Sequence, residues 1–444
     1  MTMPSADRPP RPLVCRAGAG TLPGGRLRRA VGRFHAGWRR CLRWLGVRLT
    51  RRRPPSGDEP GRYDRVFADA LAAGDRLARE VAAERAAAAS FVARLVELPA
   101  GQRRLLIANS GACTRSVCEL LIDKARSLRH TSAHDTLAWA ELARQAAERQ
   151  AGRYGLELAG RAWAEVGNAY RILGDLAEAG RALAKAERLL ADAGADPLAE
   201  ADLASLQASL AHDRRDLAGA IRLLERAAAL YEEVGEGAGL ARTLLKLASV
   251  HDRSGVPERG ISIARRALAL TDGLDDSALR RTATHNLIYL VAESGQPLAA
   301  AALLARARPL FGPAAGRLDR WRFEWLAARI DRDLGLAERA ARRLTVLRRR
   351  YLREELPYEV ALVSLDLAAA HFASGRRDEL ARLAAESTSL FRSLGIAREA
   401  LASVALLADL TARDAADVLR EAAAAVEDAR RRASATPRRG PWSA

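Results

Sequence analysis

Apolar residues recur at steps of three and four over most of this chain, which is the period of an amphipathic α-helix. From residue 61 to about residue 98 the pattern predicts a long helix rich in Ala, Arg and Glu, broken once near Ala87. Two shorter helices are predicted from Gln102 to Asn109 and from Thr114 to Leu128. The first part of the chain is therefore expected to be helical.

The stretch from Gly160 to Ala191 contains two such patterns, separated by Gly174-Asp175, and predicts an antiparallel helix pair. Its large residues fall on the sides that would face each other. Its small residues would let the two backbones approach closely. The large residues are Trp163, Val166, Tyr170 and Leu183, and the small ones are Gly167, Ala179 and Ala186.

The features of this pair return at a regular interval. A turn residue recurs at steps of 41 and then 40, and it is glycine at every position but one: Gly174, Arg215, Gly255, Gly295, Gly335 and Gly375. The position of Ala179 recurs in the same phase at Ala220, Gly260, Ala300, Ala340 and Leu380. A degenerate copy precedes the clear one, with Trp139 and Ala143 at the positions of Ala179 and Leu183, so that large and small are exchanged. The chain is therefore an array of helix pairs.

The spacing of Trp163, Val166, Gly167 and Tyr170, followed by Ala179, Leu183 and Ala186, resembles the tetratricopeptide (TPR) repeat. This resemblance implies an all-α, right-handed TPR-like α-solenoid of antiparallel helix pairs. The period exceeds the usual length of about 34 residues, and the surplus is expected in the segments between repeats, such as 191–201. Long-period arrays of this kind are similar to those of bacterial maltose-regulator-type activators and of kinesin light chains.

Charge is unevenly distributed along the chain. The formal net charge is +18, but residues 1–53 hold fourteen Arg against the single acid Asp7, and residues 430–439 hold five more Arg. The repeat body is close to neutral, so nucleic acid is an unlikely partner for it. Four Cys in 444 residues exclude a disulfide scaffold. With no apolar signal-peptide region, we expect the protein in the bacterial cytoplasm.

We expect four parts along the chain. Residues 1–60 form a disordered basic arm, residues 61–112 a helical lead-in, residues 113–432 the repeat array with a C-terminal cap, and residues 433–444 a disordered tail. Within the arm, residues 26–49 have the pattern of a basic amphipathic helix, which could contact an anionic membrane or a partner. A functionless arm from a miscalled start is the alternative.

Two groups of side chains suggest chemistry but have simpler explanations. Cys113, Cys118, His130 and His134 approach a zinc-finger spacing, yet the residues between them predict a helix rather than a metal-presenting hairpin. His-Asp pairs at residues 212–213 and 251–252 lie in nearly the same repeat phase, so they are repeat echoes. We therefore predict no catalytic residues, no metal, no cofactor and no enzymatic activity.

The TPR resemblance implies a concave groove lined by the first helix of each pair. The candidate groove residues are Arg161, Asn168, Arg171, Arg242, Lys246, His285, Tyr289, Arg322, Trp325, Arg329 and Arg332. Guanidinium groups pair with carboxylates and aromatic rings add contact area, so an acidic protein or peptide segment is the expected ligand. The TPR carboxylate clamp is half present: Asn168, Arg242 and Lys246 match it, whereas Ala164 and Leu206 replace its Lys and Asn. Alternatively, these Arg only solvate a surface.

The sequence thus predicts a non-catalytic TPR scaffold that binds a protein or peptide in a regulatory or assembly role. Two other functions remain open. One is a membrane-peripheral adaptor anchored by residues 26–49, and the other is a sensor that folds round a peptide or a small ligand.

Overall fold

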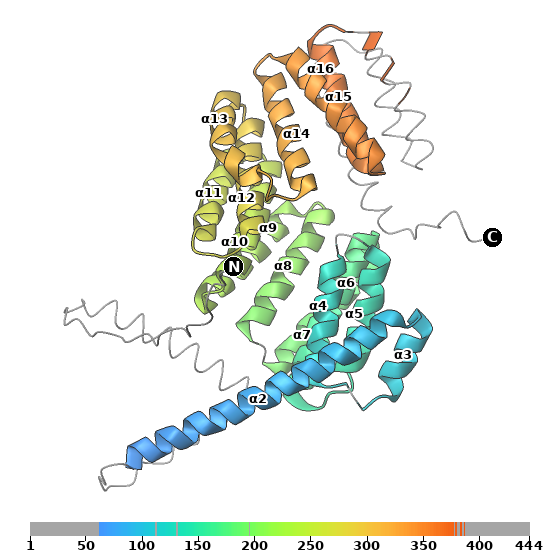
Figure 1. The fold of residues 1–444 in the computed structure, drawn as a ribbon, viewed down its shortest axis with the longest axis vertical. Coiled ribbons are helices and arrows are strands. Elements are labelled where there is room, and N and C mark those ends of the chain that lie inside the picture. The colour runs from blue at the N-terminus through green and yellow to red at the C-terminus, as the bar shows by residue number, and fades with distance from the viewer. Residues whose placement is uncertain are drawn as a thin grey trace, which may run out of the picture. The chain divides into compact units, whose positions relative to one another are not determined.

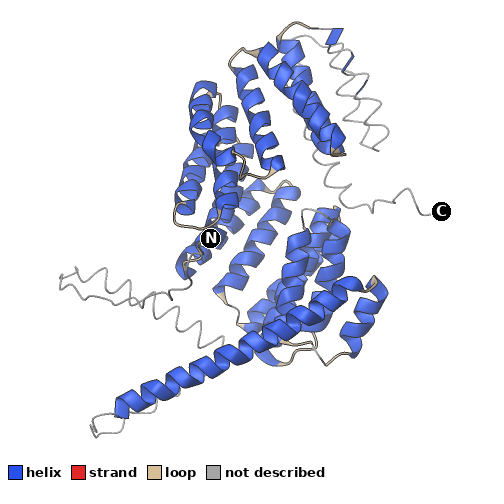
Figure 2. Ribbon diagram, in the orientation of Figure 1, coloured by secondary structure: helices blue, strands red, loops and turns tan. Residues whose placement is uncertain are grey.

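The computed structural model describes residues 62–376 except 112, 130, 131 and 195, together with residues 378, 379, 382, 383 and 386. The predicted basic arm, its amphipathic stretch 26–49, the C-terminal cap and the tail lie outside the described residues, as does Leu380. The described residues form helices and contain no strand (Figure 2). The predicted all-α class is therefore confirmed.

The helices follow one another along the chain with short connections (Figure 1). Those from Leu71 onward belong to one compact unit. Their bounds are α2 Arg62–Glu97, α3 Ala100–Asn109, α4 Arg115–Leu128, α5 Ala133–Ala147, α6 Gly152–Leu173, α7 Leu176–Ala193, α8 Pro197–Asp213, α9 Leu217–Val234, α10 Gly237–Arg253, α11 Pro257–Thr271, α12 Ser277–Glu293, α13 Pro297–Ala307, the 3₁₀ helix η1 Arg308–Phe311, α14 Arg317–Asp333, α15 Ala337–Arg353 and α16 Pro357–Ala373.

Helix α2 runs without interruption from Arg62 to Glu97, so the predicted break near Ala87 is wrong. The residues around Ala87 are mostly Ala, the strongest helix former, and neither Gly nor Pro stands among them. The helix ends just before Leu98-Pro99, because a residue that precedes proline disfavours the helical conformation.

The predicted helix pair is α6 and α7, and local sequence defines the turn between them. Gly174 adopts the left-handed conformation at φ 86° and ends α6. The Asp175 backbone N–H donates to the Tyr170 carbonyl, which closes the turn. The Asp175 carboxylate then accepts from the Glu178 N–H at 2.9 Å and caps the start of α7. The Gly-Asp dipeptide thus ends one helix and begins the next.

All six phased turn residues have positive φ, which confirms the repeat period. Their φ values are 86° at Gly174, 64° at Arg215, 81° at Gly255, 76° at Gly295, 79° at Gly335 and 70° at Gly375. Arg215, the one non-glycine, keeps the same conformation as the others. An L-residue with a side chain pays about 1–2 kcal/mol for it.

Replacing Arg215 by Gly is therefore expected to stabilise the protein by about 1 kcal/mol, measured as a higher unfolding midpoint in urea. Arg215→Ala is the control, because it removes the guanidinium but keeps the Cβ atom that opposes positive φ. A stabilisation of equal size in both variants would show that the side chain, and not the backbone conformation, carries the cost.

Small residues let α6 and α7 approach closely, as the sequence predicts. A Cβ atom on Gly167 would lie 2.7 Å from Leu183 Cγ and 3.2 Å from the Ala179 carbonyl oxygen. Two turns along, a Cβ atom on Gly160 would lie 2.7 Å from Leu190 Cγ. At either position, a residue larger than glycine would clash with α7 unless that helix shifted.

The surplus length of the repeat lies between the repeats at only two of the described connections, residues 272–276 between α11 and α12 and residues 308–316, which include η1, between α13 and α14, so that expectation is wrong for the other repeats. Only residues 194–196 separate α7 from α8, and only residues 235 and 236 separate α9 from α10. The helices themselves are long, with 18 residues in α7, 17 in α8 and 18 in α9. In these repeats the period near 40 therefore reflects longer helices.

Candidate partner-binding face

The first helix of each pair lies on the inner side of the array. Successive first helices contact one another: α4 with α6, α6 with α8, α10 with α12, α12 with α14, and α14 with α16. Among the described helices, successive second helices from α5 to α15 make no contacts of comparable extent. Helices that converge in a curved array line its concave side. We call the side formed by α4, α6, α8, α10, α12, α14 and α16 the inner face.

At the N-terminal end of the inner face, a buried carboxylate joins three helices. Glu165 of α6 is 1% exposed and accepts from Arg126 Nε of α4 at 2.7 Å. Arg129, which follows α4, reaches the same carboxylate at 3.1 Å. Arg126 also pairs with Asp202 of α8 at 2.9 Å, and Asp202 in turn accepts from the Tyr231 hydroxyl. Burial opposes the charge of Arg126, but Glu165 and Asp202 outweigh it and raise the pKa of Arg126.

The predicted groove residues of α6 are largely engaged with the protein itself. Asn168 is buried, and its Oδ1 atom accepts from Arg171 Nε at 3.2 Å and from a terminal guanidinium nitrogen at 3.0 Å. Arg171 also pairs with Asp213 at the end of α8, at 2.7 Å. Arg161, at the other end of the same face, is half-buried.

The two predicted residues of α10 point to opposite neighbours. Arg242 lies 3.7 Å from Asp276, which caps α12. The Lys246 ammonium donates to α8 instead, to Ser205 Oγ at 2.8 Å, to the Ser205 carbonyl at 3.3 Å and to Ser209 Oγ at 3.2 Å. Solvent reaches Lys246, but the surrounding protein desolvates it and, with Arg171 and Arg129, lowers its pKa to about 8.

The C-terminal candidates converge on two carboxylates. Arg329 of α14 pairs with Glu293 of α12 at 2.7 Å, and its guanidinium lies 5.2 Å from the centre of the Tyr289 ring. Asp366 of α16 accepts from Trp325 Nε1 at 2.6 Å. Asp366 also pairs with Arg332 at 3.1 Å and lies 3.8 Å from Arg329 Nε. The guanidinium groups of Arg329 and Arg332 thus already have carboxylates from neighbouring repeats.

Two candidates in this region lack such partners among the described residues. His285 of α12 is half-buried, and desolvation lowers its pKa, with the charge of Arg322 acting in the same direction. Arg322 is exposed and forms no ion pair with a described residue. The structure therefore divides the predicted groove into cations committed to the fold, such as Arg171 and Arg332, and open ones, such as Arg322.

Two of the residues that match the TPR carboxylate clamp also have partners within the protein. Asn168 is occupied by Arg171, and Arg242 lies beside Asp276. Of the two matching cations, Arg242 has a carboxylate within 4 Å, whereas Lys246 has only neutral acceptors among the described residues. The clamp stays a prediction, with Lys246 as its cation without a carboxylate partner.

Sequence reasoning missed the partners of these cations. Glu165, Ser205, Asp213, Glu293 and Asp366 each lie between 34 and 42 residues from the cation or indole they contact. That separation is close to one repeat, so a search for opposite charges one period apart could have found several of these contacts.

The zinc hypothesis finds no support in the thiols. Cys118 is fully buried in α4, and burial raises the pKa of its thiol to about 12, whereas zinc binds the thiolate. His134 is exposed at the start of α5, and His130 lies outside the described residues. In the described part of the chain, no group of three or more His, Cys, Asp or Glu side chains is arranged to hold a metal ion. None of the described helices is long and apolar enough to cross a membrane.

Comparison with known proteins identifies the fold. No protein-family model matches the sequence, and neither does any curated protein. Among solved structures, a Rap protein complexed with competence and sporulation factor matches with a TM-score of 0.52 and 13% identity over 72% of this chain and 88% of that one. A signal-transduction ATPase with a tetratricopeptide repeat sensor, from Pyrococcus horikoshii, matches with a TM-score of 0.48 and 15% identity over 70% of this chain and 53% of that one. Aspartyl phosphate phosphatase F from Bacillus subtilis matches with a TM-score of 0.46 and 12% identity over 76% of this chain and 99% of that one.

These identities are too low to transfer an activity, and the resemblance to maltose-regulator-type activators gains no support from the three structures. What the Rap protein shares with this chain is the arrangement of helices, which agrees with the phased turns and closely packed helix pairs described above. The chain is a TPR-like helical-repeat solenoid.

Proposed function

We propose that this protein is a non-catalytic scaffold that binds a segment of a protein or peptide on its inner face, in a regulatory or assembly role. The observation that carries the proposal is the chemistry of that face. Polar and aromatic side chains line the first helices, from Arg126 on α4 to Asp366 on α16. Hydrogen bonds and ion pairs between repeats fix many of them in place before any ligand arrives, which lowers the entropy cost of binding.

The fold supports the same proposal. The matching Rap protein is complexed with competence and sporulation factor, so a chain of this fold can hold a partner. Solenoids present extended concave surfaces that suit long segments better than compact molecules. The acids of the inner face, such as Glu165 and Asp366, are shared among guanidinium groups and are therefore not free to act as general bases.

The test compares affinity capture by the inner-face triple variant and by an outer-face control. The inner variant replaces Arg161, Lys246 and Arg322 by Glu, because none of the three forms an ion pair with a described residue. Arg329 and Arg332 are left intact, since a Glu there would face Asp366 and could disturb the fold. The outer control replaces exposed Arg residues of the second helices and changes the net charge equally: Arg222, Arg265 and Arg349 to Glu.

We expect the wild-type protein and the outer control to capture the same partner from a native lysate, identified by mass spectrometry. The inner variant should retain at least tenfold less of it. Equal capture by all three proteins would contradict binding on the inner face. Circular dichroism spectra of the variants verify that each remains helical.

A further inference from the structure

One step along the inner face is less closely packed than the others. Between α4 and α16, the first helices α8 and α10 make fewer close backbone contacts than any other two successive first helices. There the connection is made by a side chain, because Lys246 of α10 reaches over to Ser205 and Ser209 of α8. Side-chain hydrogen bonds thus replace part of the close backbone packing at this step.

Lys246 differs from the other cations at the centre of the inner face. Arg171, Arg329 and Arg332 each pair with a carboxylate of a neighbouring repeat at 3.1 Å or less. Lys246 has only neutral acceptors, two hydroxyls and one carbonyl. The nearest acids on the α8 side, Glu165 and Asp202, already belong to Arg126. An external carboxylate that takes the place of one neutral acceptor would exchange a neutral hydrogen bond of Lys246 for a stronger, charge-assisted one.

On the inner face, α10 carries a cation, Lys246, toward α8 and an acid, Asp252, toward α12. Asp252 lies six residues beyond Lys246, which corresponds to about 9 Å along the helix and about 120° around it. It faces the α12 side, where its charge acts on Tyr289. Asp252 is half-buried, forms no ion pair with a described residue, and has its pKa raised by burial. Between the two, Ser249 is small and exposed and leaves the surface of α10 uncovered.

We propose that the inner face from α8 to α12 binds a dipolar peptide segment, with a carboxylate at Lys246 and a cationic side chain at Asp252. The Ser205 and Ser209 hydroxyls accept from the ammonium and hold it in position, and the Ser209 hydroxyl in turn donates to the Ser205 carbonyl at 3.0 Å. An extended chain advances about 3.3 Å per residue, so an acid and a base four positions apart span the two groups. This inference rests on the proposed function, and it replaces a uniformly acidic partner by one of mixed charge.

The test uses the wild-type protein labelled with ¹³C at the lysine ε-carbon. Lysine occurs only at positions 124, 185 and 246, so each signal can be followed separately. The probe is acetyl-Asp-Ala-Ala-Ala-Arg-amide, and the comparison peptides end in Gln or in Asp instead of Arg. We expect the probe to move the Lys246 signal saturably, with a Kd at least fivefold below that of either comparison peptide. Lys124 and Lys185 serve as internal controls.

Two variants test which residue binds each charged end of the peptide. The Kd of each variant is measured with ¹⁵N-labelled peptide. Lys246→Gln should weaken binding of all three peptides about tenfold, whereas Asp252→Asn should weaken only the peptide that ends in Arg. Lys185→Gln, on an exposed part of α7, should change nothing. An unmoved Lys246 signal, or equal binding of the peptide with two Asp, would overturn the inference. The proposed function is tested separately, because it fails only if the inner-face triple variant captures its partner as well as the wild-type protein does.

Discussion

Replacing Glu165 by Gln is expected to lower the free energy of unfolding by about 3–5 kcal/mol, the range for breaking a buried ion pair from one side. The carboxylate is 1% exposed and accepts from both Arg126 and Arg129. A neutral amide would leave two guanidinium groups close together with their shared anion removed. The loss should appear in urea unfolding followed by circular dichroism.

Because repeat arrays can unfold in parts, hydrogen exchange should accompany the denaturation curve. We expect the faster exchange in Glu165→Gln to be confined to α4, α6 and α8, the helices that this cluster joins. Glu178→Gln is the matched control, since Glu178 pairs with Arg181 at the exposed surface of α7 and its loss should leave the unfolding midpoint unchanged. A midpoint that is equally unaffected in both variants would mean that water screens the buried cluster.

Much of the fold could be predicted from the sequence because its determinants are local. Each turn depends on one residue with positive φ, visible as a letter at a fixed period, and after Gly174 and Arg215 an Asp also caps the next helix. Gly174-Asp175 is the clearest example. The same phase located Arg215, whose conformation matches the glycines although its side chain disfavours it. Helix boundaries are less sharply marked in the sequence pattern, which therefore assigned to the connections residues that belong to long helices such as α7 and α8.

The binding face was only partly predictable, because its chemistry depends on distances between repeats. Periodicity predicted which side of each first helix faces inward. It could not show that Arg329 and Arg332 share Asp366, or that Asn168 is used up by Arg171. These contacts depend on how closely successive helices approach. The looser packing between α8 and α10 has no counterpart in the sequence pattern either.

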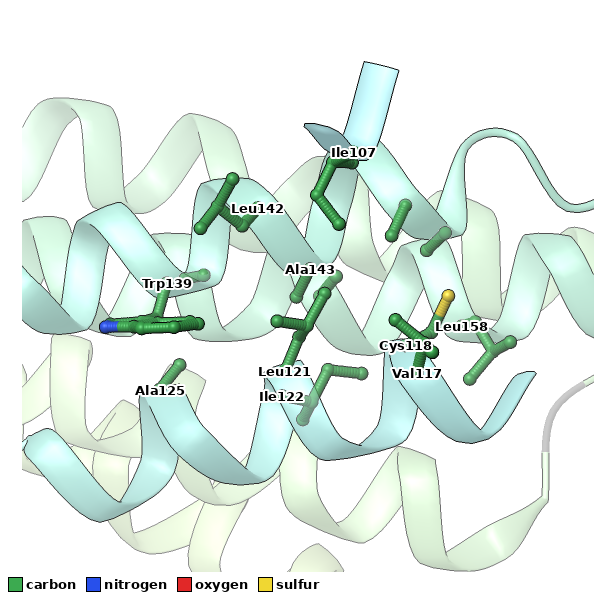
Figure 3. Packing of buried hydrophobic residues seen from close by; sticks show 14 of the residues in the cluster. Ile107, Val117, Cys118, Leu121, Ile122, Ala125, Trp139, Leu142, Ala143 and Leu158 are labelled. Atoms are coloured by element: carbon green, nitrogen blue, oxygen red, sulfur yellow. The ribbon is translucent and has the colours of Figure 1, made fainter. Parts of the chain in front are cut away.

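Replacing Trp139 by Ala is expected to cost about 3–5 kcal/mol, as large aromatic-to-Ala changes in a core do. The indole is 3% exposed and belongs to the buried cluster that α3, α4, α5 and α6 share (Figure 3). Arg103 and Lys124 lie over its ring, with their charged groups 4.8 Å and 5.8 Å from the ring centre. Thermal unfolding by circular dichroism measures the loss, and Trp139→Phe should retain a large part of the stability.

Trp139→Ala would leave a cavity in this buried cluster. The repeat phase explains why the cavity would not close by itself and suggests how to fill it. In the clear repeat the corresponding positions hold Ala179 and Leu183, so that a small residue precedes a large one. In the degenerate copy, Trp139 precedes Ala143, and both are buried. Trp139→Ala alone would leave two small residues in succession, whereas the double variant with Ala143→Leu restores the order of the clear repeat. We expect the second substitution to recover about 1–2 kcal/mol, as filling part of a cavity with a leucine side chain should. If the double variant is less stable than Trp139→Ala, the packing between α4 and α5 does not follow the repeat, and the copy is degenerate in structure as well as in sequence.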